Sequence, residues 1–128
     1  MGRLIMKLEL NFLPDKPTLN GRIYEKDTLI EAFKDKVDIP VTSFPSKGIA
    51  VNLKDIIGFA NLSELSYEKI EFDIKPINQS MLDVVKKLTI SGIGEVERVD
   101  VKNDQGLITE SKKVVKDLKI NYLFAAIS

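Results

Sequence analysis

Apolar and polar residues alternate in two segments of the chain. In the first segment, apolar residues stand at every second position and polar residues between them: Leu4, Met6, Leu8, Leu10 and Phe12 against Lys7, Glu9 and Asn11. The second segment, Lys69–Lys75, alternates strictly. A period of two is typical of a strand with one buried face. It predicts that Phe72 and Ile74 point inward and that Glu71 and Asp73 are exposed.

Two segments follow a helical period instead. From Asp27 to about Val37, apolar residues recur at four-residue spacing, and Asp27 is a suitable N-cap. A second, shorter helix is predicted over Met81–Lys87, capped by Ser80. Its expected apolar set is Met81, Leu82, Val84, Val85 and Leu88.

Further strands are predicted in the rest of the chain. Ile39–Ser43 is expected at a sheet edge because Pro40 lacks a backbone N–H. Leu88–Ser91 and Glu95–Val101 are expected to be extended, with Gly92 and Gly94 marking a bend or bulge between them. Asn103–Gly106 is a turn signal, and Val114–Ile127 is predicted as the closing strand, with Leu118, Ile120, Tyr122 and Phe124 on one face. The pattern predicts a mainly β (α+β) fold, a compact antiparallel and partly closed β-barrel with two short helices, in a single domain over residues 1–128.

Composition removes several kinds of chemistry. The chain contains neither His nor Cys. Disulfides, thiolate nucleophiles and Cys-based zinc sites are therefore absent, and so is the side chain that most often acts as a general base near neutral pH. No Asp-rich calcium loop appears, so we expect no metal and no cofactor. Lys plus Arg equals Asp plus Glu at 19 each, and this zero net charge gives no global attraction to nucleic acid or to an anionic membrane.

The N-terminal segment does not look like a targeting signal. Residues 1–10 interrupt their apolar positions with polar ones, and no stretch approaches the length of a membrane span. We expect an intracellular product, a class that includes virus parts assembled in a host cytoplasm.

Three segments carry a resemblance to a known family. The first is Asn20-Gly21-Arg22-Ile23-Tyr24, which precedes the first helix. The second runs from Val51 to Ile74, and the third is Leu88–Gly94. In this order they resemble the prohead (head-maturation) proteases of tailed phages, which share a β-barrel-like fold with the herpesvirus assemblins. The resemblance implies that Val51–Ile74 forms the central hairpin and that Ser91 stands at the position of the nucleophile. It also places the end of the protease domain at the closing strand, and we expect no scaffold-binding tail.

The same resemblance exposes a missing residue. The catalytic His of the family often precedes a Pro in the loop before the central hairpin, where this chain has Phe44-Pro45. Phenylalanine cannot accept a proton, and an isolated Ser hydroxyl is a poor nucleophile at neutral pH. The loss of a base from a catalytic triad typically slows the reaction on the order of 10⁶-fold. Ser91 is therefore the family-like candidate for a nucleophile, but no catalytic residue is expected.

Each of these motifs also has a simpler interpretation. Ser91 can be a small strand residue beside a bend, and Asn20-Gly21 can be a plain turn. A Lys could replace the missing His, with Lys54, Lys86 and Lys87 as candidates. Gly92-Ile93-Gly94 lacks the third glycine and the following helix of a phosphate loop. The Lys112-Lys113 and Lys116-Asp117 cluster is expected to be a solvated face or loop, with nucleic-acid contact as the alternative.

The leading functional hypothesis is a non-enzymatic phage virion protein, a pseudoenzyme that serves as a capsid auxiliary, decoration or head-assembly component. Its partners would be capsid or other head proteins of the same virus, with self-association as a further option, and neither a membrane nor a specific nucleic acid is expected. The predicted binding segment is Phe44, Pro45 and Ser46. The alternatives are an active prohead serine protease that processes capsid and scaffold proteins, and an interaction module with no viral structural role.

Overall fold

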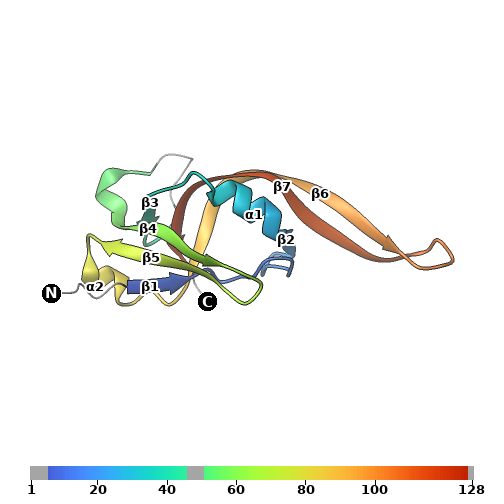
Figure 1. The fold of residues 1–128 in the computed structure, drawn as a ribbon, viewed down its shortest axis with the longest axis horizontal. Helices are drawn as coiled ribbons and strands as arrows, with labels where there is room; N and C mark the ends of the chain where they lie inside the picture. The colour runs from blue at the N-terminus through green and yellow to red at the C-terminus, as the bar shows by residue number, and fades with distance from the viewer. Residues whose placement is uncertain (1–5, 46–50, 127–128) are drawn as a thin grey trace.

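The computed structural model describes residues 6–45 and 51–126. It contains one seven-stranded sheet, two short helices and a single 3₁₀ turn (Figure 1). The strands are β1 (Met6–Glu9), β2 (Arg22–Tyr24), β3 (Ile39–Thr42), β4 (Ile56–Leu65), β5 (Ile70–Pro76), β6 (Leu88–Lys102) and β7 (Ile108–Ala125). The helices are α1 (Lys26–Phe33) and α2 (Gln79–Leu82), and the 3₁₀ turn is η1 (Leu53–Asp55). The mainly β fold predicted from the sequence is confirmed.

Strand β7 organises the sheet, whose order is β1-β5-β4-β3-β7-β2 with β6 on the other edge of β7. β6 pairs with β7 in antiparallel orientation along its whole length. On the opposite edge of β7, both β2 and β3 run parallel to it. The expectation of an antiparallel sheet is therefore wrong at these two pairs. Parallel strands need a long connection, and here the chain from α1 to β6 separates β2 from its partner β7, while the chain from η1 to β6 separates β3 from β7.

The sheet curls on itself but is only partly closed. The chain after β1 reaches β6 through one isolated bridge, in which Leu10 lies beside Leu88 and the Asn11 N–H donates to the Leu88 carbonyl oxygen at 2.8 Å. No longer ladder joins these two edges within the described residues. This agrees with the predicted partly closed barrel.

The core lies inside the curl and is closed by α1. Leu29 and Phe33 of α1 are buried, and the Phe33 ring meets the Phe72 ring edge-on at a centroid distance of 5.3 Å. Phe72 is fully buried and Ile74 nearly so, which confirms the inward face predicted for this strand.

The outward face of β5 differs from the prediction at one residue. The Asp73 side chain is 41% exposed, but the Glu71 side chain is only 14% exposed. The ammonium of Lys69 lies 3.1 Å from the Glu71 carboxylate and that of Lys7 lies 3.5 Å from it, and both cover it. The hydrogen bond from Lys69 is the main cause that holds the pKa of Glu71 below its usual range.

Both helices are shorter than predicted. α1 ends at Phe33, and its N-cap is Glu25 rather than Asp27. Val37 lies outside the helix and is 77% exposed, because the chain turns at Asp38 into β3. Asp38 has a positive φ of 47°, and its backbone N–H donates to the Asn61 side chain at 2.9 Å. Val37 fits the helical spacing of apolar residues in the sequence, but it lies in the segment that leads to this turn and not in the helix.

The second helix has a different cap. α2 begins after Asn78, whose side chain accepts a hydrogen bond from the Met81 N–H at 3.2 Å, so Ser80 is not the cap. Of the predicted apolar set, Leu82, Val85 and Leu88 are buried, whereas Met81 and Val84 are exposed. The helix has only four residues, and one turn cannot bury so wide a face.

Strand β3 is not at an edge, contrary to the prediction from Pro40. It lies between β4 and β7. Its pairing with β7 involves only Val41 and Thr42, one residue beyond Pro40. An interior strand tolerates this proline because the ladder on that side begins after it.

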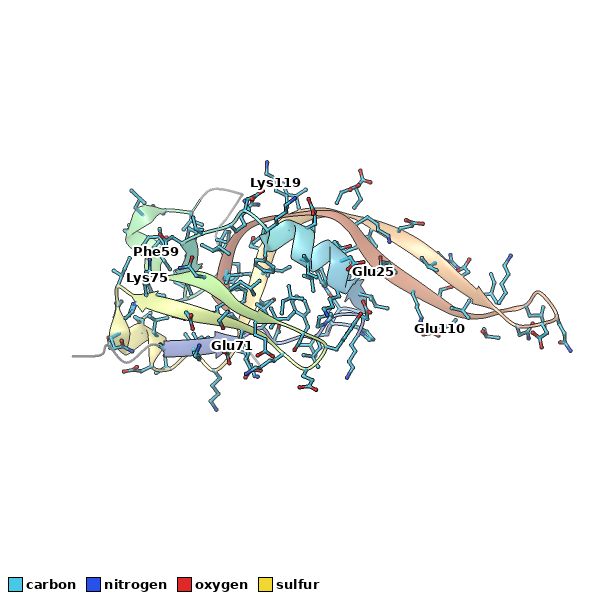
Figure 2. The ribbon with its side chains drawn as sticks, in the orientation of Figure 1. Glu25, Phe59, Glu71, Lys75, Glu110 and Lys119 are labelled. Carbon is cyan, nitrogen blue, oxygen red and sulfur yellow. The ribbon has the colours of Figure 1, made fainter. Side chains whose placement is uncertain are left out.

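Strands β6 and β7 form a hairpin that extends far beyond the body of the protein (Figure 1). Its turn is Asn103–Gly106, as predicted, with the Gly106 N–H donating to the Asn103 carbonyl oxygen at 3.0 Å. β7 starts at Ile108, six residues before the predicted start of the closing strand. We call the part of the hairpin from 95 to 116 the arm. Figure 2 shows Glu110 on this arm, away from the body.

Candidate functional site

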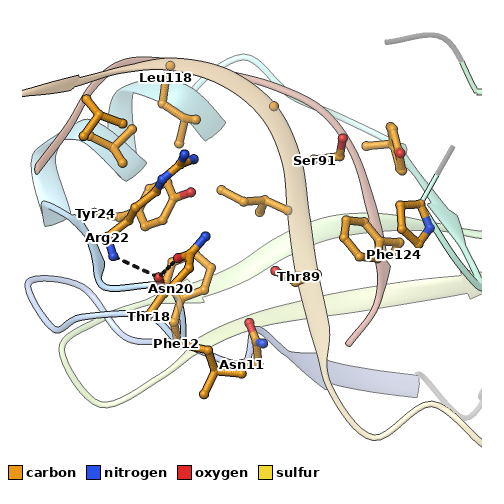
Figure 3. Close-up of a pocket in the computed structure, with 18 residues that line it drawn as sticks. Asn11, Phe12, Thr18, Asn20, Arg22, Tyr24, Thr89, Ser91, Leu118 and Phe124 are labelled. Carbon is orange, nitrogen blue, oxygen red and sulfur yellow. Dashed lines mark hydrogen bonds between the residues drawn. The ribbon is translucent and has the colours of Figure 1, made fainter. Parts of the chain in front are cut away.

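A groove of about 490 Å³ lies where the arm joins the body (Figure 3). Its walls come from the segment that leads into β2, from Pro45, from the first half of β6 and from β7. The lining residues are Asn11, Phe12, Thr18, Leu19, Asn20, Arg22, Tyr24, Pro45, Thr89, Ile90, Ser91, Gly92, Gly94, Val96, Val115, Leu118, Tyr122 and Phe124. Two of the three family-like segments meet here, because Asn20, Arg22 and Tyr24 of the first and Ser91 of the third line the groove, beside Pro45 from the loop before the second. No described residue of the second segment, Val51–Ile74, lines it.

One wall of the groove is a tight turn built by the Asn20-Gly21-Arg22 segment. The Gly21 N–H donates to the Thr18 carbonyl oxygen at 2.9 Å, and Gly21 has a positive φ of 78°, which suits glycine. The Thr18 hydroxyl donates a hydrogen bond to Asn20 Oδ1 at 2.5 Å and accepts one from the Arg22 N–H at 3.2 Å (Figure 3). The structure supports the turn interpretation of this motif. The turn also leaves Leu19 86% exposed at the rim of the groove.

Arg22 provides the positive charge of the groove. Of the described residues that line the groove, only Arg22 carries a full charge at neutral pH. It lies beside Tyr24, whose ring stacks on Phe12 at a centroid distance of 4.8 Å. Burial raises the pKa of the Tyr24 hydroxyl, and the Arg22 guanidinium partly opposes that rise. Tyr24 is thus a neutral hydrogen-bonding group, and Arg22 can attract a carboxylate.

Ser91 lies on β6, directly opposite Tyr122 of β7 and just before a bulge. It is half-buried. In Figure 3, Ser91 lies on the Phe124 side of β6, whereas Asn20 and Arg22 lie on the other side. The Ser91 hydroxyl has no hydrogen-bond partner among the residues that the structure describes. It is therefore accessible but not activated by any of them.

The two glycines after Ser91 have a structural reason. A Cβ on Gly92 would come within 2.4 Å of the Lys119 carbonyl oxygen, and one on Gly94 within 2.9 Å of the Val115 side chain. The register between β6 and β7 shifts between Ser91 and Gly92 and again between Ile93 and Glu95. The irregularity predicted at these glycines is confirmed as two bulges, but they lie within one continuous strand rather than between two.

The predicted binding segment is only partly at the groove. Pro45 lines it, and Phe44 is 58% exposed without lining it. The Phe44 carbonyl oxygen accepts a hydrogen bond from the Thr42 hydroxyl at 2.7 Å, and this bond holds the Phe44 backbone at the end of β3. Ser46 lies outside the described residues. Phe44 is thus an exposed aromatic ring on a tethered backbone rather than a plug in the core.

The described part of the groove wall holds no general base. It contains no Asp, Glu or Lys. The three lysines considered as substitutes for His, Lys54, Lys86 and Lys87, do not line it, and the Lys87 ammonium lies 3.5 Å from the Glu9 carboxylate instead. A groove with one guanidinium, neutral polar groups and apolar walls can bind an extended segment. None of its described residues is a proton acceptor of the kind that nucleophilic attack by a serine requires.

Residues 6–45 and 51–126 form neither a cluster suited to a metal ion nor a helix suited to a membrane. No cluster of three or more acidic side chains is arranged to hold a metal ion. No helix there has the length and apolar character needed to cross a membrane.

A solved structure resembles this fold. It is the bacteriophage T4 capsid assembly protease, gp21. The TM-score is 0.65 at 11% sequence identity, and the match covers 95% of this chain and 81% of that one. Comparisons with protein-family models and with curated proteins find no match. The likeness supports the prohead-protease-like fold expected from the sequence and is confined to the fold.

Sequence reasoning missed part of the groove. Leu118 and Phe124 were predicted only as one face of a strand, and both line the wall. Their role depends on how β7 curls, which no local pattern reports. For Tyr24 a signal was present, because it stands in the family-like segment that also contains Asn20 and Arg22.

Proposed function

We propose that this chain is a non-enzymatic component of a phage head, a capsid auxiliary or assembly protein built on a prohead-protease-like fold. The observation that carries the proposal is the groove itself, where Ser91 is present but no described lining residue can take its proton. The likeness to a capsid assembly protease supports a place in head assembly. The proposed location is the virion, with assembly in the host cytoplasm.

In this proposal the groove holds an extended segment of a capsid or scaffold protein without cutting it. The edge of β6 beside the groove and before its first bulge, Thr89–Ser91, pairs with no strand except β7 within the described residues. A bound segment could add to such an edge through backbone hydrogen bonds, which is a common mode of peptide recognition. Arg22 would select a segment with a carboxylate, and the Phe44 ring would extend the contact beyond the groove.

A cleavage assay tests the absence of activity. The protein is incubated with the capsid and scaffold proteins of its own virus, and the products are separated on a gel. We expect no specific fragments from the wild-type protein or from Ser91→Ala. Specific fragments that disappear in Ser91→Ala would overturn the proposal.

That outcome would establish the second candidate, an active prohead serine protease. One observation favours it, because Ser91 stands in a groove of the expected fold with a free hydroxyl among the described residues. Binding separates the two candidates further. A non-enzymatic protein should retain its partner segment intact after long incubation, and Arg22→Ala should weaken that retention while Ser91→Ala should not.

A further inference from the structure

The arm carries an exposed strand edge. β6 pairs with β7 on one side, and its other side pairs with no strand among the described residues along the arm. From Glu95 to Val101 the register with β7 is regular, with shifts only before and after this stretch. All of these residues are exposed. The arm therefore presents a continuous row of unpaired backbone N–H and C=O groups.

Two features indicate that this edge is built to be covered. First, beyond Arg98, where β2 no longer pairs with β7, the arm is a ribbon of two strands. Such a ribbon by itself is at best marginally stable in water, and three or more strands are needed for independent stability. Second, natural sheet edges are usually protected by charged side chains, lysine above all, by proline or by a bulge. The stretch from 95 to 101 has no lysine, no proline and no bulge. Its charged residues Glu95, Glu97, Arg98 and Asp100 include both signs, and they are interspersed with Val96, Val99 and Val101, which are 43%, 38% and 38% exposed.

We infer that the arm of a second copy of this chain covers this edge, with the two β6 strands antiparallel and Val99 opposite its own counterpart. This register places Arg98 opposite Asp100 of the second copy, and Asp100 opposite its Arg98. In each copy Arg98 and Asp100 already lie on one face, 3.0 Å apart. Opposite charges on directly facing cross-strand residues stabilise a sheet.

The two antiparallel β6 strands could also be centred on another residue with the same faces of the sheet aligned, but these registers bring like charges together. A shift that centres the pair on Arg98 places the two guanidinium groups opposite each other. A centre at Asp100 faces two carboxylates, and a centre at Glu97 does the same. In a register centred on Val101, half of the pairing would involve the bulge after Val101 and the turn that follows it. Within the regular stretch, only the Val99 register pairs opposite charges, and this argues for a second copy rather than an unrelated strand.

The geometry of the arm permits this pairing. The two bodies lie at opposite ends of the joined arms, because the strands run antiparallel and each arm extends away from its body (Figure 1). β2 covers β7 on the far side, at Lys113–Val115. The strand order across the join is then β2-β7-β6 followed by β6-β7-β2 of the second copy. The zero net charge of the chain adds no global repulsion between the copies.

A cysteine pair tests the register, since the chain has no cysteine of its own. In Val99→Cys, the two thiols face each other at a Cα distance of about 4.5–5.5 Å, within the range of a disulfide. In Val101→Cys they are about 13 Å apart along the strands, because four residues separate them. The two valines are equally exposed at 38%, so they form a matched pair. We expect a disulfide-linked dimer from Val99→Cys and essentially none from Val101→Cys under the same mild oxidation.

Charge-reversal variants test whether the partner is a second copy of this chain, with dimer formation measured by analytical ultracentrifugation. Arg98→Asp and Asp100→Arg should each weaken the dimer about tenfold or more, since both symmetric pairs become like charges. Mixing the two variants should restore dimers, because each of the two facing pairs between the copies then joins a carboxylate to a guanidinium. Neither variant regains its internal ion pair between positions 98 and 100 on mixing, so restoration would come from the contact between copies.

Three results would overturn the inference: a monomer at all concentrations, equal crosslinking of Val99→Cys and Val101→Cys, or no heterodimer in the mixture. Circular dichroism of each variant verifies that it is folded. The outcome is independent of the proposed head function, which the cleavage and binding assays test separately.

Discussion

Gly92 on β6 lies so close to Lys119 on β7 that a Cβ atom at position 92 would come within 2.4 Å of the Lys119 carbonyl oxygen. This contact is between two main chains, so no side chain can move aside to relieve it. It lies beside the groove, next to Ser91, and at the shift in register where the hairpin bends. The glycine therefore links the shape of the groove to the direction of the arm.

Gly92→Ala should lower the free energy of unfolding by roughly 1–3 kcal/mol, the usual cost of overpacking a tight site. Chemical denaturation measures this change. The control is Ile93→Ala at the neighbouring position, whose side chain is 56% exposed. That variant should change stability by about 0.5 kcal/mol or less. A neutral Gly92→Ala would show that the two strands can separate at the bulge without cost.

Two phenylalanines give a matched test of the core. Phe72 is completely buried and packs against Phe33, whereas Phe44 is 58% exposed. Phe72→Ala should destabilise the protein by roughly 3–5 kcal/mol. Phe44→Ala should cost about 0.5 kcal/mol or less. Equal losses in denaturant titrations would mean that the assigned inner face of β5 is wrong.

The proposed role of Phe44 leads to a functional prediction. Phe44→Ser should fold normally by circular dichroism but enter particles in reduced copy number, because an exposed aromatic ring can dominate an interface. Val37→Ser is the control, since Val37 is 77% exposed and does not line the groove. Normal incorporation of Phe44→Ser would place the interface elsewhere on the surface.

Stability should fall at acidic pH through identifiable carboxylates. Hydrogen bonds from Lys69, and from Asn61 and Lys75, lower the pKa values of Glu71 and Asp38 below their usual 4.5 and 3.8. A lowered pKa in the folded state means that the stabilisation is complete above the ordinary pKa. It is lost as the pH falls through the folded-state pKa. We therefore expect thermal stability to decline below about pH 4.5.

Glu71→Gln should flatten that acid decline, because it removes the titrating group. Glu110→Gln is the control, an exposed carboxylate on the arm without an ion pair among the described residues. Melting temperatures measured from pH 2 to pH 8 would show the difference. Between pH 6 and pH 8 the curve should be nearly level, since the chain has no histidine. An unchanged acid decline in Glu71→Gln would contradict the assigned role of the Lys69 pair.

The local pattern of the sequence was sufficient for features that depend on near neighbours. Alternation predicted the buried face of β5 at Phe72 and Ile74, and turn-forming residues predicted the end of the hairpin at Asn103–Gly106. The glycines at 92 and 94 predicted the irregularity in β6. The absence of His and Cys, which no fold can alter, removed the usual chemistry of a serine or cysteine nucleophile.

Tertiary structure decided the features that depend on distant segments. Pro40 predicted an edge strand, but β3 lies inside the sheet, between β4 and β7. The proline is tolerated there because the pairing with β7 begins one residue later. Val37 continued a helical period, yet the turn at Asp38, held by Asn61 from β4, ends that pattern. Glu71 was predicted to be exposed, but Lys7 of β1 and Lys69, the residue before β5, form ion pairs with its carboxylate and cover it. The groove likewise exists only because the curl of β6 and β7 brings Ser91 and Pro45 to the turn that contains Asn20 and Arg22. Period and turn chemistry act over a few residues, whereas burial and pairing are set by whichever segments the folded sheet brings together.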